Sequence, residues 1–304
     1  MNSYYDNESR CSQSFCNLGK CHHLWTPENF ETIFFTENDF KIGMNIIGIC
    51  AKLSPDIKII TFEIMSNHLH FAIKGDEESI MTFFESVKKF LSRHFAKAGR
   101  AINWANFLAK SRELSTLDDI RNVIVYINRN GYVVTRHHTP FSYPWGTNRY
   151  YFNSDAVALS SLMSRQMTQR ERQSSINSRV ADHIEGLSIF EGCALPLSFC
   201  YIDEGESLFR DASHYFYKLG RSIETNKAIA REISESIFYT DDELYLAISS
   251  LAKEKYGIPV LAQASANIKM ELARIMKFDY NATPKQIARF LKISIETLNS
   301  IFGK

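Results

Sequence analysis

Apolar positions in the first half of the chain change their spacing several times, and each spacing predicts a different element. From Phe30 to Leu53 they recur at helical intervals and stop before Pro55, which predicts a helix. Residues 57–65 are rich in β-branched and aromatic side chains, and residues 68–74 alternate between polar and apolar. Because the turn-forming pair Ser66-Asn67 separates the two segments, we predict a β-hairpin.

Two amphipathic helices are predicted after the hairpin. An apolar stripe at helical spacing runs from Ile80 to Phe95, with basic residues off the stripe, so its apolar side should face the core. The second helix covers residues 115–130 and ends at Gly131, which suits a left-handed C-terminal cap. Tyr126 lies on the polar side of this helix, where packing alone does not account for an aromatic residue. The apolar stripe of the second helix consists of Ile120, Val123, Ile124 and Ile127.

The remaining segments are less regular. Residues 1–21 are polar and lack periodicity, so we expect a loosely ordered arm. Residues 153–195 begin with a stretch rich in Ser, Arg, Gln and Asn, and we expect them to form a linker. Residues 196–304 are predicted to form an all-α domain. Within that domain, residues 283–301 predict two capped helices, a pattern typical of a helix-turn-helix and equally of an ordinary helical hairpin.

Composition limits the class of protein. A chain of 304 residues with 45% hydrophobic and 23% charged residues can bury a core and a second helical unit, which excludes wholesale disorder. No apolar run approaches the roughly 20 residues that a membrane-spanning helix needs, and the first residues lack the basic-then-apolar order of a signal peptide. We therefore expect a soluble, intracellular, cytoplasmic protein with no membrane partner.

Six cysteines are too sparse for a disulfide framework in a chain of this length, so we expect free thiols. Cys11, Cys16 and Cys21 lie close to His22 and His23, and such a cluster could hold zinc. The gaps between these cysteines differ from the paired spacing of structural zinc sites, which favours simple thiols.

Charge is distributed unevenly along the chain. The overall formal charge is +1, but residues 86–180 contain 15 Lys and Arg against 5 Asp and Glu, a net charge of +10. Residues 1–85 contain 6 basic and 12 acidic side chains, and residues 181–304 contain 14 and 17. A basic centre between acidic flanks indicates binding of a polyanion, although a solvated helix face would look the same.

Two pairs of side chains suggest chemistry. Alternation along the second hairpin strand puts His68 and His70 on one face, which makes half of a metal site or a solvent-facing pair without a role. Tyr126 and Asn130 lie one helical turn apart and project together. If that helix lies over the sheet, His68, His70 and Asn130 can ligate a divalent cation while Tyr126 points at whatever the cation holds.

These residues also carry a resemblance to a known family. The segment Met65-Ser66-Asn67-His68-Leu69-His70-Phe71 resembles the Met-x-Asn-His-hydrophobe-His signature of single-tyrosine HUH transposases, and Tyr126-Ile127-Asn128-Arg129-Asn130 resembles their catalytic-tyrosine helix. The likeness covers roughly residues 22–152 and is nearest to the REP-associated tyrosine transposases, which are relatives of insertion-sequence transposases. Smaller similarities lie in Ile33-Phe34-Phe35 with Asp39, in Tyr143-Pro144-Trp145 and, for an accessory tail, in Gln286-Ile287-Ala288-Arg289.

The chain departs from the family at two places. Gly131 follows the asparagine where the family often has proline, and the usual first strand is not evident in residues 22–29. The resemblance implies an α+β fold in residues 22–152, with a ferredoxin- or RRM-like antiparallel sheet and helices on one face. The linker at 153–195 and the all-α domain at 196–304 would follow it.

The activity that the resemblance implies is metal-dependent cleavage and joining of single-stranded DNA. Tyr126 would attack a phosphorus atom to form a 5′-phosphotyrosine, and His68, His70 and Asn130 would hold Mg²⁺ or Mn²⁺. Two rival functions remain open: a catalytically idle DNA-binding regulator of the same fold, and a metallohydrolase that uses activated water with Tyr126 as a bystander. Because all four residues precede residue 152, we expect deletion of the chain after Leu195 to leave cleavage of a generic strand intact.

Single-stranded or hairpin DNA is the partner that this chemistry implies, in a cytoplasmic, nucleoid-associated setting. The chain could act as a monomer or as a homodimer, and nothing in the sequence separates the two. The basic residues expected to follow the DNA backbone are Lys88, Lys89, Arg93, Lys97, Arg100, Lys110, Arg112, Arg121 and Arg129.

Overall fold

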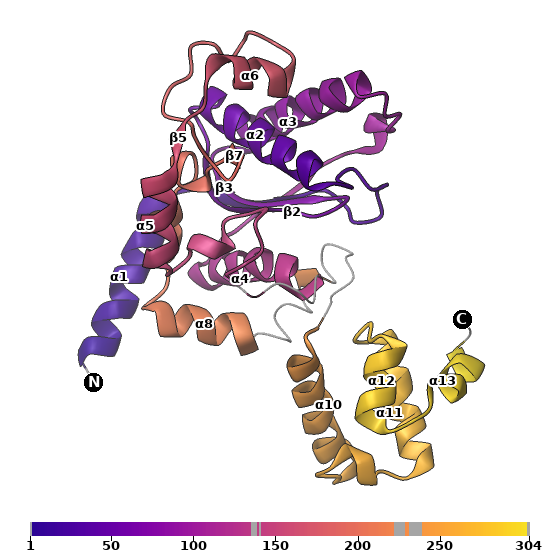
Figure 1. Cartoon of the computed structure of the whole chain (residues 1–304). Helices are drawn as coiled ribbons and strands as arrows, with labels where there is room; N and C mark the ends of the chain where they lie inside the picture. The colour runs from indigo at the N-terminus through magenta and orange to yellow at the C-terminus, as the bar shows by residue number, and fades with distance from the viewer. Residues whose placement is uncertain (1, 135–138, 140, 222–228, 231–238, 303–304) are drawn as a thin grey trace. The chain divides into compact units, whose positions relative to one another are not determined.

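A computed structural model describes residues 2–134, 139, 141–221, 229–230 and 239–302 (Figure 1). The chain divides into two compact units, residues 1–219 and residues 220–304. The boundary between them therefore lies near residue 220 and not within the linker predicted at 153–195.

The first unit is built on a four-stranded antiparallel sheet with strand order β2-β3-β1-β4. The elements that form its centre alternate as strand, helix, strand, strand, helix, strand, which is the ferredoxin-like arrangement expected from the sequence. The α+β fold class is confirmed. These elements are β1 (Cys21–Trp25), α2 (Glu37–Leu53), β2 (Lys58–Ile64), β3 (Leu69–Lys74), α3 (Glu77–Lys97) and β4 (Lys110–Glu113).

Helices cover both faces of this sheet, which corrects the expectation of helices on one face. Figure 1 shows α2 and α3 on one side of the sheet and α4 (Leu117–Val134) on the other. Alternation along β3 explains the division: Leu69 and Phe71 belong to the core with α2 and α3, and Phe71 packs edge-on to Phe83 with ring centroids 5.6 Å apart. His70, between them, faces α4.

The predicted hairpin and the two helices after it are confirmed, with shifted ends. The helix predicted from Phe30 begins only at Glu37, because Thr36 forms a capping box with Asp39. The segment before it is pinned to the hairpin turn, since the backbone N–H groups of Ile33 and Phe34 both donate to Ser66 O.

Helix α4 extends through Gly131, which corrects the predicted C-terminal cap. A Cβ atom on Gly131 would lie 2.1 Å from the Tyr143 ring and 2.3 Å from Glu63 Oε1. The glycine is therefore needed for close approach of the helix to the sheet and does not end the helix. The predicted apolar stripe of α4 is buried, but Tyr126 is buried too and does not lie on a solvent-exposed face.

Two N-terminal elements were missed by the sequence pattern. Residues predicted as a loose arm form α1 (Asn2–Leu18), which is held by buried Cys11 and Leu18 and by an ion pair of 2.7 Å between Glu8 and Arg121. All five residues of β1 are buried, because this strand is central in the sheet and covered on both faces. A strand of that kind shows no polar–apolar alternation.

Residues 153–219 are part of the first unit. Asn45 Oδ1 on α2 accepts a hydrogen bond of 2.7 Å from the Ala194 N–H, and Met167, Ile176 and Leu187 join the same core. The polar residues that suggested a linker instead cap helices or lie on exposed helix faces. One example is the capping box that Thr168 and Glu171 form. The elements are α5 (Ser154–Met163), β5 (Arg165–Gln166), α6 (Gln169–Ile176), β6 (Ser188–Phe190), β7 (Cys193–Ala194), α7 (Ile202–Glu206) and α8 (Ala212–Arg221).

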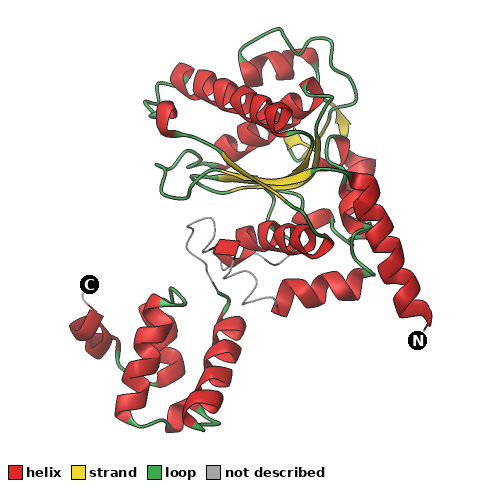
Figure 2. Cartoon of the chain, turned by 180° about the vertical axis from the view of Figure 1, so that it is seen from behind, coloured by secondary structure: helices red, strands yellow, loops and turns green. Residues whose placement is uncertain are grey.

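The described part of the second unit consists of helices and loops (Figure 2). Thr283 caps the first helix of the predicted pair through a capping box with Gln286, and Ser294 Oγ accepts from the Thr297 N–H at 3.1 Å at the start of the second. The two capped helices are confirmed, and their role in DNA recognition stays a prediction. The helices are α10 (Asp241–Tyr256), α11 (Ala266–Phe278), α12 (Pro284–Leu291) and α13 (Ile295–Phe302).

Four single 3₁₀ turns complete the described elements, at Trp104–Asn106, Asn148–Tyr150, Pro196–Ser198 and Leu261–Gln263. Within the described ranges, none of the helices combines the length and the apolar character that crossing a bilayer requires.

Candidate functional site

Imidazole and phenol rings gather between the sheet and α4. The ring centroid of Tyr126 lies 5.7 Å from that of His70 and 6.2 Å from that of His23. His68 and His70 are perpendicular to each other, with centroids 5.0 Å apart. The structure thus brings together three of the predicted site residues, His68, His70 and Tyr126, although the histidines and the tyrosine are more than fifty residues apart in the sequence.

The orientation of His68 is set by Asn67. Asn67 Nδ2 donates to the Phe30 carbonyl at 3.1 Å, which fixes the amide so that its Oδ1 faces His68 Nδ1 at 2.8 Å. An amide oxygen only accepts, so the shared hydrogen is on His68 Nδ1. The Nε2 atom of His68 then has the lone pair that a cation needs.

His23 is a site residue that the sequence analysis placed only in the N-terminal Cys and His cluster. Its Nε2 lies 3.4 Å from His70 Nδ1, and the two rings stack with centroids 5.6 Å apart. Such a contact holds the His70 ring in one orientation and leaves its Nε2 side toward the space next to His68. The signal that could have identified His23 is a pair of histidines next to the apolar residues Leu24 and Trp25.

Glu63 on β2 is a second residue that the sequence analysis missed. It is paired in register with His70 and is 1% exposed. Burial raises the pKa of its carboxyl well above the usual range, and the Gly131 N–H opposes that shift. The signal in the sequence that could have identified Glu63 is an acidic residue within the mostly apolar segment of β2.

A buried polar network fixes α4, and therefore Tyr126, relative to the sheet. Thr61 on β2 donates to Asn128 Oδ1, and Asn128 Nδ2 donates to the Tyr215 hydroxyl at 3.0 Å. The same hydroxyl donates to Asn148 Oδ1 at 3.0 Å. Because Tyr215 belongs to α8, residues well beyond the predicted nuclease domain help to position the candidate nucleophile.

The candidate nucleophile is shielded from solvent. Tyr126 is 1% exposed, and His70 is fully buried. Asn130, the third predicted ligand, is half-buried one turn beyond Tyr126. A phosphate can reach the Tyr126 hydroxyl only after a rearrangement of the segments that cover it.

Most of the predicted DNA-binding residues are placed away from this cluster. Four of them are on α3, which lies on the opposite face of the sheet, so they cannot contact a phosphate held near His70. The side chains of Arg121 and Arg129 are buried, and Arg121 is paired with Glu8. Arg100 is half-buried and paired with Asp39 at 3.2 Å. The α3 residues are Lys88, Lys89, Arg93 and Lys97.

Two of the predicted basic residues lie on the face that α4 covers. Lys110 and Arg112 on the edge strand β4 are directly opposite Trp25 and His23 in the register. Directly opposed residues point to the same side of a sheet. Lys110 is exposed, and Arg112 is half-buried with an ion pair of 3.5 Å to Asp119.

The three N-terminal cysteines differ in their exposure to solvent. Cys11 and Cys21 are buried, whereas Cys16 is exposed, and burial raises the pKa of Cys21 to about 12. Over the part of the chain that the structure describes, no three His, Cys, Asp or Glu side chains are preassembled to hold a metal ion. The predicted cation site therefore consists of two imidazoles and the Asn130 amide.

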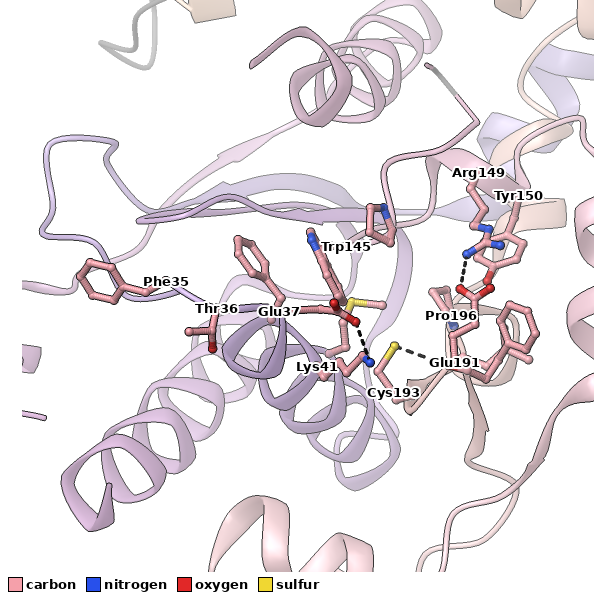
Figure 3. A pocket seen from close by; sticks show the side chains of 16 residues that line it. Phe35, Thr36, Glu37, Lys41, Trp145, Arg149, Tyr150, Glu191, Cys193 and Pro196 are labelled. Atoms are coloured by element: carbon pink, nitrogen blue, oxygen red, sulfur yellow. Dashed lines mark hydrogen bonds and ion pairs between the residues drawn. The ribbon is translucent and has the colours of Figure 1, made fainter. Parts of the chain in front are cut away.

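A separate cavity of about 490 Å³ opens on the α2 side of the unit and contains none of the predicted site residues (Figure 3). Two ion pairs lie in its wall: Lys41 with Glu37 at 2.7 Å and Arg149 with Glu191 at 2.8 Å. Trp145 stacks on Phe40 there, with ring centroids 5.1 Å apart. This cavity is distinct from the cluster under α4.

Comparison with protein families finds a similarity within the first unit. A family model described as "Transposase IS200 like" matches residues 16–130. Residues 16–130 are thus similar to IS200-like transposases. The match begins before β1 and includes His68, His70, Tyr126 and Asn130, whereas α5–α8 and the second unit lie outside it. Searches of curated proteins and of solved structures found no match.

This similarity supports a DNA-processing enzyme with transposase-like activity and a DNA partner.

Proposed function

We propose that this IS200-like protein is a metal-dependent single-stranded DNA endonuclease and strand transferase with Tyr126 as its nucleophile. The observation that carries the proposal is the convergence of the Tyr126 ring with His70 in one chain, at a centroid distance of 5.7 Å. A phenol is a competent nucleophile toward phosphorus when it is held next to a cation that binds the phosphate.

The residues of the site fit a divalent cation. His68, His70 and Asn130 would hold Mg²⁺ or Mn²⁺ through two imidazole nitrogens and an amide oxygen, and the buried carboxylate of Glu63 lies on the neighbouring strand. When bound, the ion supplies positive charge to the non-bridging oxygens of the scissile phosphate.

Tyr126 performs the covalent step. Its hydroxyl oxygen attacks phosphorus and loses its proton, the bond from phosphorus to the 3′ oxygen breaks, and the departing 3′ oxygen takes up a proton. The product is a 5′-phosphotyrosine ester. Because the ester conserves the energy of the phosphodiester bond, the 3′-hydroxyl of a second strand can reverse the step and join the strands.

The proposal also covers the substrate and the assembly. The resemblance of residues 65–71 to REP-associated transposases favours hairpin or repeat DNA, and the capped helices α12 and α13 would add a second DNA contact. Since the imidazoles and the phenol meet within one chain, a homodimer is not needed to complete the site.

Covalent trapping tests the proposal. Wild-type protein incubated with single-stranded hairpin DNA and Mn²⁺ should give a protein–DNA species that survives SDS, and Tyr126→Phe should abolish it. The phenyl ring keeps the packing against His23 and His70 and removes only the attacking oxygen. Cleaved DNA without attached protein would instead support the metallohydrolase, and DNA binding without cleavage would support the idle regulator.

The placement of basic residues makes a second prediction. Lys110→Ala and Arg112→Ala should each weaken binding of single-stranded DNA about threefold to tenfold. Each should also reduce the magnitude of the slope of log K against log salt concentration by about 0.7. Lys89→Ala and Arg93→Ala on α3 are the matched controls, because they remove the same charges from the other face of the sheet. Fluorescence anisotropy at several salt concentrations measures both quantities. Equal losses in the two pairs would contradict the proposed DNA path.

A further inference from the structure

Glu63 is a carboxylate in a position where strand packing alone would favour an apolar side chain. It lies on β2 between Phe62 and Ile64, and 1% of its surface is exposed. Neither carboxylate oxygen receives a hydrogen bond from a side chain among the described residues. A buried carboxylate needs hydrogen bonds or a metal ion to balance the loss of water, and the backbone N–H of Gly131 is one such partner.

The position of Glu63 points to the candidate cation site. Glu63 is directly opposite His70 in the antiparallel pair, so the two side chains leave the sheet on the same face and next to each other. His23 lies on the other flank of His70, with 3.4 Å between His23 Nε2 and His70 Nδ1. His70 is therefore flanked by His23 on one neighbouring strand and by Glu63 on the other.

Helix α4 leaves room for this carboxylate. A Cβ atom on Gly131 would lie 2.3 Å from Glu63 Oε1, so any side chain there would displace the glutamate. Gly131 directly follows Asn130, the predicted amide ligand. The nearby Tyr143 hydroxyl donates to the Ile64 carbonyl at 2.7 Å and is thus engaged elsewhere.

We propose that Glu63 supplies a carboxylate oxygen to the divalent cation held by His68 and His70. This inference rests on the proposed function, because it needs the same cation. The described His, Cys, Asp and Glu side chains do not form a preassembled group of three. We therefore expect binding of the ion to require a side-chain rotation of Glu63 or a bridging water. Mixed carboxylate and imidazole donors suit Mn²⁺.

Binding of Mn²⁺ alone to the full chain tests the inference by calorimetry. Glu63→Gln keeps the shape of the side chain and removes its charge, and we expect it to raise the Kd for Mn²⁺ about 10- to 100-fold. Glu206→Gln is the matched control, because burial also raises the pKa of Glu206 but this residue is on α7 and accepts from the Phe152 N–H. Its Kd should stay within about twofold of wild type. A Glu63→Gln Kd within twofold of wild type would overturn the inference.

Two further measurements separate the proposed role from a structural one. The melting temperature of metal-free Glu63→Gln should stay within a few degrees of that of wild type, because burial favours the uncharged form of the carboxyl and an amide of the same shape replaces it. Should this variant fail to fold, infrared difference spectra of wild type with ¹³C-labelled glutamate decide the question. Mn²⁺ should perturb a buried carboxyl band, and an unchanged band would overturn the inference.

The inference and the proposed function can fail separately. Loss of Mn²⁺ binding in His70→Ala but not in Glu63→Gln would remove Glu63 from the cation site and leave the proposed function standing. A covalent adduct that persists in Tyr126→Phe would overturn the proposed nucleophile while the Glu63→Gln result stood. Wild-type protein that binds no Mn²⁺ would overturn both the cation site and the role of Glu63.

Discussion

Truncation of the chain after Leu195 is expected to unfold the first unit, whereas a chain that ends at Arg221 is expected to fold. Residues 196–219 contribute large buried side chains to that unit, and the loss of each costs about 2–5 kcal/mol. A typical domain is stable by only about 5–15 kcal/mol, so their combined loss exceeds the total. The large buried side chains of this segment that the chain ending at Leu195 lacks are Phe199, Ile202, Leu208, Phe209, Tyr215 and Leu219.

Thermal melting followed by circular dichroism measures this difference. The chain ending at Arg221 should melt cooperatively and should still form the covalent adduct with hairpin DNA. The chain ending at Leu195 should show no cooperative transition. A melting temperature for the shorter chain within a few degrees of the longer one would show that α7 and α8 are dispensable. The sequence alone predicts that outcome, because the pattern places the linker at 153–195.

His70→Ala is expected to reduce DNA cleavage by at least about 100- to 1000-fold, a loss typical of removing charge stabilisation at a reacting phosphate. DNA binding should stay within about tenfold of wild type, because contacts from basic side chains to the phosphate backbone dominate affinity. His70 is fully buried and lies next to both Tyr126 and His68, so its removal affects the cation and the nucleophile together.

Single-turnover cleavage and anisotropy on the same DNA separate the two effects. His94→Ala is a suitable control: His94 is a half-buried histidine on α3, across the sheet from the cluster, and its ring contacts the Ser175 carbonyl at 3.2 Å. Its cleavage rate should match wild type. Parallel losses of binding and cleavage in His70→Ala would contradict the division between a cation site for chemistry and basic residues for affinity.

The elements that the sequence predicted well have a clear local signal. Helix α3 has apolar residues on its buried side and basic residues on its exposed side, which gives the helical periodicity. The hairpin is buried on both faces, and its signals are the Ser66-Asn67 turn and the alternation of polar and apolar residues along β3. Strand β1 was missed because it is short, does not alternate between polar and apolar residues and has no hairpin turn beside it. Its two histidines were grouped with the N-terminal cysteines.

The site residues were predictable to different degrees. His68, His70, Tyr126 and Asn130 form a pattern that is local in sequence, two residues or one helical turn apart. Glu63 and His23 come next to His70 only through the register of the paired strands. That register is set by pairing between distant segments, which a single sequence does not reveal. The basic residues of α3 were assigned to DNA because charge was counted along the chain, without knowledge of which face of the sheet each side chain occupies.

By itself the sequence determined the type of the main elements, the α+β class and the identity of two short motifs, since these depend on side chains within a few positions of one another. Only the tertiary structure decided which side chains meet under α4, which basic residues share that face and where the first unit ends. Those properties come from contacts such as Asn128 with Tyr215 and Asn45 with Ala194. The first pair is separated by 87 positions in the sequence and the second by 149. Contacts over such separations depend on how whole elements pack, so they do not appear as a periodic pattern in the sequence.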